Sequence, residues 1–167
     1  MNGAHWHLVV NHLPIVFPIV GIIVLLSGLL LKSAIVKRTA FMIFMMGAVA
    51  AFAAMSTGEG AEDVVKALDS TSKRYIHEHE EIAETFAILS YLLGALSLLG
   101  IWASLKQKAF DSILSIGIVI LAFVVLFFSR QTGTTGGEIR HPEIRGVVDT
   151  AISDNSFISG AGGAGIQ

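Results

Sequence analysis

The sequence predicts an all-α integral membrane protein, a four-helix bundle built from two tandem helical hairpins with both termini outside the cytoplasm. Of its 167 residues, 53% are hydrophobic and only 14% are charged, whereas soluble domains are about a quarter charged. The apolar residues gather in four runs, each long enough to cross a hydrocarbon core of roughly 30 Å. The net charge of −2 does not indicate nucleic-acid binding. The chain has no cysteine, which excludes disulfides, iron–sulfur clusters and covalent haem attachment.

These runs define a four-span membrane domain over residues 1–145 and leave residues 146–167 as an extra-membrane C-terminal tail. Pro14 falls in the first turn of the first run, where proline is tolerated. The second run is rich in glycine and alanine, which allow close helix packing in lipid. No charged residue lies in the middle of any run, which argues against an ion path. The expected spans cover about residues 8–31, 39–55, 82–105 and 110–128.

Basic residues in the short links between spans predict the orientation of the bundle. The link between the first two spans and the link between the last two carry Lys32, Lys37, Arg38, Lys106 and Lys108. Because Lys and Arg near span ends favour the cytoplasmic side, both links are expected in the cytoplasm. The termini and residues 56–81 then lie outside, which in a bacterial inner membrane is the periplasm.

Histidines are expected only on that outer side. They are His5, His7, His12, His77, His79 and His141. Each half of the chain begins with histidines before its first span and ends with a glycine-rich, acidic segment, residues 57–62 and 132–138. We interpret the halves as an internal repeat of two hairpins, related by an axis along the membrane normal. Both histidine groups and both glycine-rich turns would then meet at the outer end of one bundle.

Helical spacing separates the histidines of the third span. His79 falls on an apolar stripe with Ile82 and Phe86, at the i, i+3 and i+7 positions of a helix. His77 groups instead with glutamates on a polar face. We therefore expect His79 to face the bundle interior, and His77 to face solvent or to pair with Glu81.

The histidines of the first span are expected to diverge. His7 lies five residues before His12, so the two rings would differ in direction by roughly 140° on one helix. One helix therefore cannot easily aim both rings at one ion. We expect His12 and His79 to form the principal pair, with His7 and His141 as a second pair or as partners of the acid groups of a cofactor.

Two short motifs resemble signatures of a known family. Residues 7–15, His-Leu-Val-Val-Asn-His-Leu-Pro-Ile, resemble the opening signature of the bacterial membrane family catalogued as domain of unknown function 2231. Residues 136–141 resemble its closing signature of a glycine pair, an acid, apolar residues and a histidine. His77 or His79 would match a histidine near the start of the family's third span. The resemblance covers roughly residues 5–145 and implies a four-span fold. The family has no established activity. Its members are similar in context to respiratory and haem-associated membrane proteins, and this implies a redox role.

The first functional hypothesis is a membrane electron-transfer protein that binds b-type haem at the periplasmic end of the bundle. Two imidazoles on facing helices can hold the iron axially, and haem b needs no cysteine. Glycines allow the backbone to approach a flat cofactor, although they can also simply end helices, and arginine pairs bidentately with propionates. A quinol or a periplasmic cytochrome would be the redox partner. The expected cofactor-binding residues are His7, His12, Gly58, His79, Gly136, Gly137, Arg140 and His141.

Two alternatives stay open at this stage. One is a non-haem copper, zinc or iron site, since imidazole suits all three metals; its ligands would come from His7, His12, His77, His79 and His141, with Glu59, Glu62 or Glu138. The other is a structural subunit of a larger respiratory complex, whose histidines line an interface with other membrane subunits. No catalytic serine triad or phosphate-binding loop stands out, so an enzyme acting on its own is not expected.

Overall fold

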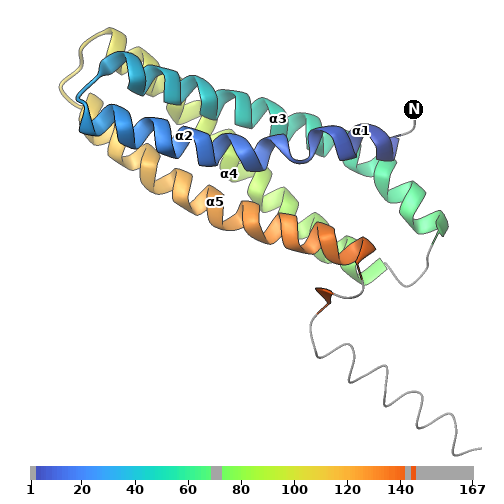
Figure 1. The fold of residues 1–167 in the computed structure, drawn as a ribbon. Coiled ribbons are helices and arrows are strands. Elements are labelled where there is room, and N and C mark those ends of the chain that lie inside the picture. Colours follow the sequence, from blue (N-terminus) through green and yellow to red (C-terminus); the bar gives the residue numbers. More distant parts are fainter. Residues whose placement is uncertain (1–2, 69–72, 142–143, 146–167) are drawn as a thin grey trace, which may run out of the picture.

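The described part of the chain folds into five helices, of which the four long ones form a bundle (Figure 1). The computed structural model describes residues 3–68, 73–141 and 144–145, so the expected tail at 146–167 lies outside the described residues. In chain order the helices are α1 (Gly3–Val10), α2 (Leu13–Leu30), α3 (Ala34–Leu68), α4 (Lys73–Leu105) and α5 (Asp111–Arg140). Four stretches are long and apolar enough to span a membrane: α1 with α2, α3, α4 and α5. For the described residues, the prediction of an all-α chain with four helical stretches long and apolar enough to cross a membrane is confirmed.

Each long helix packs against two others around the bundle. α2 contacts α3 and α5, and α4 contacts the same two helices, while the short α1 lies along α3. The two tight turns lie together at one end, which we call the basic end (residues 31–33 and 106–110). The opposite end holds α1, the end of α3, the start of α4 and the end of α5 (Figure 1). We call it the histidine end, because all the described histidines lie there.

Both tight turns close in the same way. Lys32 and Gln107 adopt left-handed backbone conformations, with φ values of 50° and 49°. The amide of Ser33 then donates to the carbonyl of Gly28 at 2.9 Å, and the equivalent bond in the second turn joins Lys108 to the helix residue five positions earlier at 3.0 Å. This is the Schellman pattern, which satisfies the last carbonyls of a helix without a long loop.

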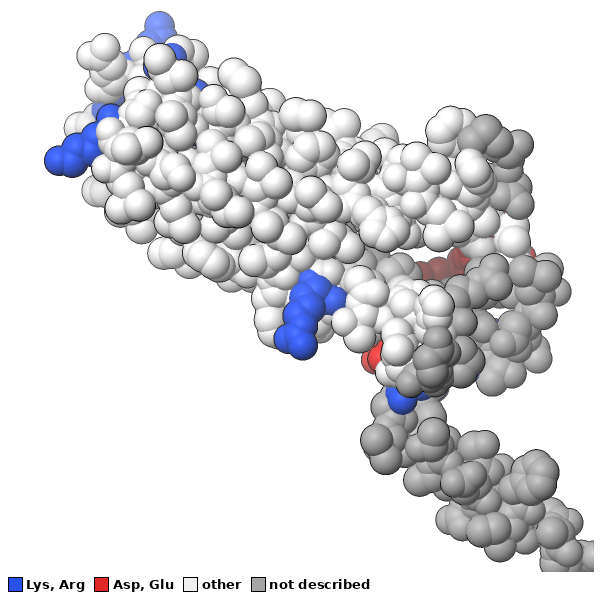
Figure 2. Space-filling model, viewed as in Figure 1, with Lys and Arg blue, Asp and Glu red and all other residues white. Residues whose placement is uncertain are grey.

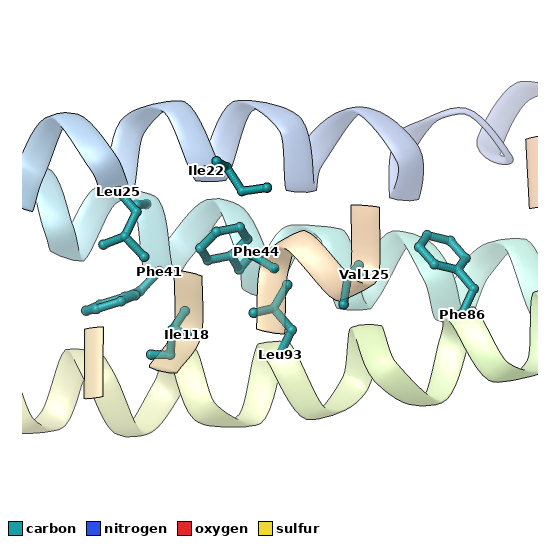
Figure 3. Packing of buried hydrophobic residues seen from close by; sticks show 10 residues of the cluster. Ile22, Leu25, Phe41, Phe44, Phe86, Leu93, Ile118 and Val125 are labelled. Carbon is teal, nitrogen blue, oxygen red and sulfur yellow. The ribbon is translucent and has the colours of Figure 1, made fainter. Parts of the chain in front are cut away.

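Large side chains from all four long helices fill the interior, and glycines make room for them (Figure 3). Phe41, Phe44 and Leu93 are almost completely buried. A Cβ at Gly21 would collide with the Phe44 ring, and a Cβ at Gly100 would come within 2.9 Å of Phe41. Close approach between helices therefore depends on these two glycines, as is usual in lipid, where small residues rather than water exclusion permit packing.

The uncharged stretches of the helices match the thickness of a bilayer. Residues 39–58 of α3, 85–105 of α4 and 112–129 of α5 contain no Asp, Glu, Lys or Arg. At 1.5 Å per residue these stretches are about 27–32 Å long, which is the thickness of a hydrocarbon core. On the face drawn in Figure 2, Lys and Arg side chains project at the basic end. The histidine end begins where these stretches stop, so α3 and α4 extend beyond the hydrocarbon there.

Buried positions recur in the two halves of the chain at fixed offsets. All six buried residues of α2 have a buried counterpart in α4 that lies 72 residues later; the α2 residues are Pro14, Pro18, Gly21, Ile22, Leu25 and Gly28. Five buried residues of α3 likewise have a buried counterpart in α5, 78 residues later; they are Lys37, Ala40, Phe44, Gly47 and Ala51. The two pairs of helices therefore present corresponding residues to a common core.

The helices are longer than the sequence predicts, and the first is divided. The glycine-rich segments at residues 57–62 and 132–138 were expected as turns, but both continue as helix, and no described glycine has a positive φ. Conversely, the first span is interrupted at Asn11 and His12, between α1 and α2. Pro14 explains the interruption, because it cannot donate to the carbonyl four residues earlier and its ring clashes there.

Candidate functional site

His7 on α1 is held by the facing surface of α3. Its Nδ1 lies 3.1 Å from the carbonyl oxygen of Ala54 and 3.2 Å from Oγ1 of Thr57. The Thr57 hydroxyl donates its own proton to the helix carbonyls three and four residues earlier, at 3.0 Å. A carbonyl oxygen can only accept, so Nδ1 of His7 must carry the proton.

His79 on α4 is held by α5 in the same way. Its Nδ1 lies 3.1 Å from Oγ1 of Thr135. The Thr135 hydroxyl donates to the carbonyl of Gln131 at 3.1 Å, which leaves its oxygen free to accept from the imidazole. We assign the proton of His79 to Nδ1 as well, which makes the ring the donor in this bond.

The two locked rings both present an unprotonated Nε2. In a neutral imidazole one nitrogen is the donor and the other keeps its lone pair. Neither Nε2 takes part in a hydrogen bond within residues 3–68, 73–141 and 144–145. Both rings lie at the histidine end of the bundle, at positions related by the 72-residue offset between the two halves of the chain. Metal-binding histidines usually have this arrangement, with the second ring nitrogen donating to a carbonyl or another oxygen.

Two of the predicted glycines lie against the histidine rings. A Cβ at Gly136 would lie 3.1 Å from Cε1 of His79, and a Cβ at Gly58 would lie 4.0 Å from Cε1 of His7. Gly136 therefore makes room for the imidazole itself, rather than for a flat cofactor as the sequence suggested. Gly137 lies elsewhere, because its Cβ would meet Ile144 at 3.1 Å.

Asn11 adds a buried polar atom that sequence reasoning missed. Its backbone N–H donates to the backbone carbonyl of His7 at 2.9 Å, one helical turn earlier. The side-chain Oδ1 is buried and has no hydrogen-bond partner among the described residues. The α2 N-cap position is taken by His12, which makes no side-chain capping bond. A buried amide oxygen without a partner is costly, and it marks a place where a ligand or water would be bound.

The other predicted histidines lie outside this site. His12 is exposed where α1 and α2 meet, whereas His7 and His79 are both half-buried and each is hydrogen-bonded to a neighbouring helix. His77 is exposed and lies 3.4 Å from a carboxylate oxygen of Glu81, which confirms the expected pairing. His141 is exposed at the end of α5. The Arg140 side chain lies outside the described residues.

The offsets that relate the buried positions of the two halves also relate their histidines. His5 and His7 lie 72 residues before His77 and His79, which is the offset that relates the buried positions of α2 and α4. Thr57 and Gly58 lie 78 residues before Thr135 and Gly136, the offset between α3 and α5. The His-x-His spacing shared by the two halves was therefore the signal for His7, whereas His12 has a glutamate at the equivalent position.

A metal site built from protein ligands alone is not formed in the described part of the chain. No group of three or more His, Asp or Glu side chains gathers within residues 3–68, 73–141 and 144–145. The carboxylates proposed as further ligands, Glu59, Glu62 and Glu138, do not join the two histidines there. Two imidazoles therefore define the site.

No family model, curated protein or solved structure matches this chain. The class of protein is accordingly defined by its fold alone, an all-helical bundle whose described residues include four stretches long and apolar enough to cross a membrane. Its function has to be argued from the site.

Proposed function

We propose that this chain is a membrane electron-transfer protein that binds b-type haem between His7 and His79. One observation carries the proposal: two histidines from different helices are each fixed through Nδ1 and each present an unpartnered Nε2. Haem iron takes four ligands from the porphyrin, so two protein ligands complete its coordination. A site with only two imidazoles therefore suits haem better than a bare copper, zinc or iron ion, which needs more protein ligands.

The residues around the two rings support the same assignment. Bonds from Nδ1 to Ala54, Thr57 and Thr135 fix the orientation of the rings and raise the basicity of Nε2. When bound, haem would supply one-electron redox chemistry. Of the other expected cofactor residues, Arg140 and His141 are left as propionate partners in this proposal.

The membrane orientation is part of the proposal. We place the histidine end in the periplasm of a bacterial inner membrane, with both termini on that side. Lys32, Arg38, Lys106 and Lys108 at the basic end support this orientation by the positive-inside rule; Lys37 contributes less, because it pairs with Asp111.

Duplication and partners complete the proposal. The fixed 72- and 78-residue offsets support an origin in two tandem hairpins. The redox partner would be a quinol or a periplasmic cytochrome, and other membrane subunits would complete a respiratory complex. Membership of the family catalogued as domain of unknown function 2231 is also proposed, on the signature residues alone.

Spectroscopy of the full-length protein, expressed in a haem-supplied host and purified in detergent, tests the haem site. We expect a reduced-minus-oxidised spectrum typical of b-type haem. Replacing His7 or His79 with alanine should abolish it, because either change removes an axial ligand. His12→Ala and His77→Ala are the matched controls, since both side chains are exposed, and both should retain the spectrum.

Three outcomes would contradict the proposal. A colourless protein that also fails to take up added haemin would exclude a haem site. Loss of the spectrum in His12→Ala with retention in His7→Ala would restore the pairing expected from the sequence. A colourless protein with stoichiometric copper, zinc or iron by elemental analysis would replace haem with a non-haem metal.

A further inference from the structure

A groove separate from the two histidine rings runs between α4 and α5 at the histidine end. Its volume is about 390 Å³, within the range of ligand-binding pockets of about 300–1,000 Å³. One lining residue, the buried Thr135, is shared with the histidine site, because its hydroxyl hydrogen-bonds His79. The lining residues are Glu78, Ile82, Phe127, Arg130, Gln131, Thr134, Thr135 and Glu138.

The groove is amphipathic along the helix axes. Ile82 lies one turn deeper along α4 than Glu78, and Phe127 lies about one turn deeper along α5 than Arg130. Arg130 is the first charged residue after the uncharged stretch at 112–129 of α5. Phe127 therefore lies within the uncharged stretch of α5, and the polar rim of the groove begins at Arg130, at the level expected for lipid headgroups.

The rim carries one positive and two negative charges that have no protein partners. Arg130 is exposed, and neither it nor Glu78 nor Glu138 forms an ion pair with any described residue. The amide side chain of Gln131 and the hydroxyl of Thr134 lie in the same lining. A guanidinium and two carboxylates in the lining of one groove complement a headgroup that holds both an anion and a cation.

We propose that this groove binds the headgroup of a phosphatidylethanolamine from the leaflet at the histidine end. Its phosphate would pair with Arg130, its ammonium group with Glu78 and Glu138, and its acyl chains would follow Ile82 and Phe127. The ammonium group donates hydrogen bonds to carboxylates, whereas a choline headgroup has no N–H and cannot. The excess negative charge of the rim disfavours anionic lipids. This inference does not rest on haem binding.

Native mass spectrometry of the full chain, released from nanodiscs of defined lipid, tests the proposal. The probes are phosphatidylethanolamine, phosphatidylcholine and phosphatidylglycerol with identical acyl chains. We expect one retained phosphatidylethanolamine per chain, bound about tenfold more tightly than the other two, as a single charge-assisted contact would give. Arg130→Gln should remove this adduct, and Glu78→Gln with Glu138→Gln should remove the preference over choline.

The control is Lys106→Gln at the basic end, which removes an exposed charge remote from the groove and should keep the adduct. Circular dichroism spectra of all variants should match, so that loss of the adduct does not reflect unfolding. Equal retention of the three lipids, or adducts that persist in Arg130→Gln, would show annular lipid only and overturn the proposal. Displacement of the lipid by a quinone at equal mole fraction would also overturn it in favour of a quinone site.

Discussion

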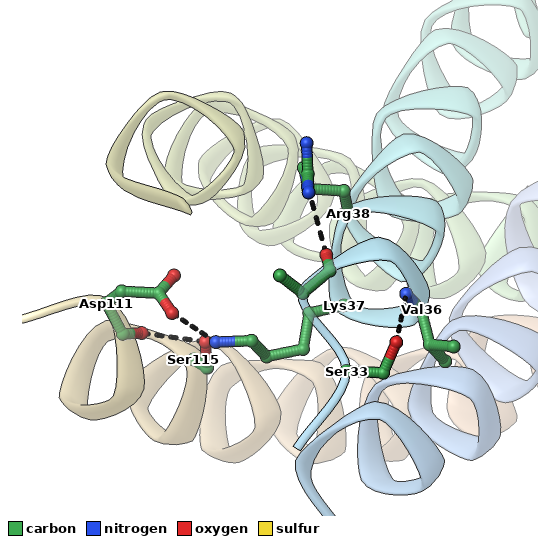
Figure 4. Close-up of polar contacts among 7 residues, drawn as sticks. Ser33, Val36, Lys37, Arg38, Asp111 and Ser115 are labelled. Atoms are coloured by element: carbon green, nitrogen blue, oxygen red, sulfur yellow. Dashed lines mark hydrogen bonds and ion pairs between the residues drawn. The ribbon is translucent and has the colours of Figure 1, made fainter. Parts of the chain in front are cut away.

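Replacing Asp111 with asparagine should lower the free energy of unfolding by about 3 kcal/mol. Asp111 begins α5 and pairs with Lys37 of α3 at the basic end (Figure 4). The Lys37 side chain is only 8% exposed and that of Asp111 18% exposed. Removing the carboxylate therefore leaves a buried ammonium group without its counter-ion, a change that costs about 3–5 kcal/mol in proteins.

The lower end of that range follows from the position of the pair. Lys37 lies at the end of the bundle, where a long lysine side chain can extend towards the headgroups. Only Oδ2 of Asp111 is used, since Oδ1 is buried without a partner among the described residues. The converse change, Lys37→Met, should lower the free energy of unfolding by about 0.3–1 kcal/mol less than Asp111→Asn does. The reason is that the remaining carboxylate lies in the first turn of α5, where the helix dipole favours a negative charge.

Reversible unfolding by SDS in mixed micelles, followed by circular dichroism, would measure these changes. The double variant Lys37→Met with Asp111→Leu should be close to the wild type, because an apolar pair needs no desolvation of charge. Lys106→Gln is the control, and it should change the unfolding free energy by no more than about 0.5 kcal/mol. A value for Asp111→Asn within about 0.5 kcal/mol of the wild type would refute the reasoning, as would a double variant whose loss equals the sum of the single losses.

Two further predictions concern close helix contacts and the histidine site. Gly28→Ala should lower the unfolding free energy by about 1–3 kcal/mol, because the new Cβ would lie 2.8 Å from the backbone nitrogen of Lys37. The control is Gly117→Ala, whose new Cβ meets nothing within 4 Å and which should be neutral or slightly stabilising. Equal losses of unfolding free energy in the two variants would contradict this account. Thr135→Val should keep the fold but weaken haem binding about 10–100-fold, because it removes the hydroxyl that hydrogen-bonds Nδ1 of His79. A haemin titration of the variant measures this change. If the titration gives the wild-type affinity, the bond does not support the site.

Local chemistry explains which parts of the fold could be predicted. Uncharged stretches of bilayer length are a property of the sequence alone, and so are the basic links that bound them. The inward orientation of His79 followed from its apolar stripe, because residues at helical spacing share a face. The glycine-rich segments were predicted wrongly as turns, because glycine is also tolerated inside a helix where another group must come close, as the His79 ring does at Gly136.

The sequence by itself therefore determined four spans, the basic end and the histidine end, because hydropathy and charge act residue by residue. Only the tertiary structure decided that His7, and not His12, is half-buried and hydrogen-bonded to a neighbouring helix, as His79 is. That choice depends on the interruption before Pro14, which separates α1 from α2 and lets α1 lie along α3. Helical periodicity relates side chains along one continuous helix, but contacts between helices depend on how their surfaces pack.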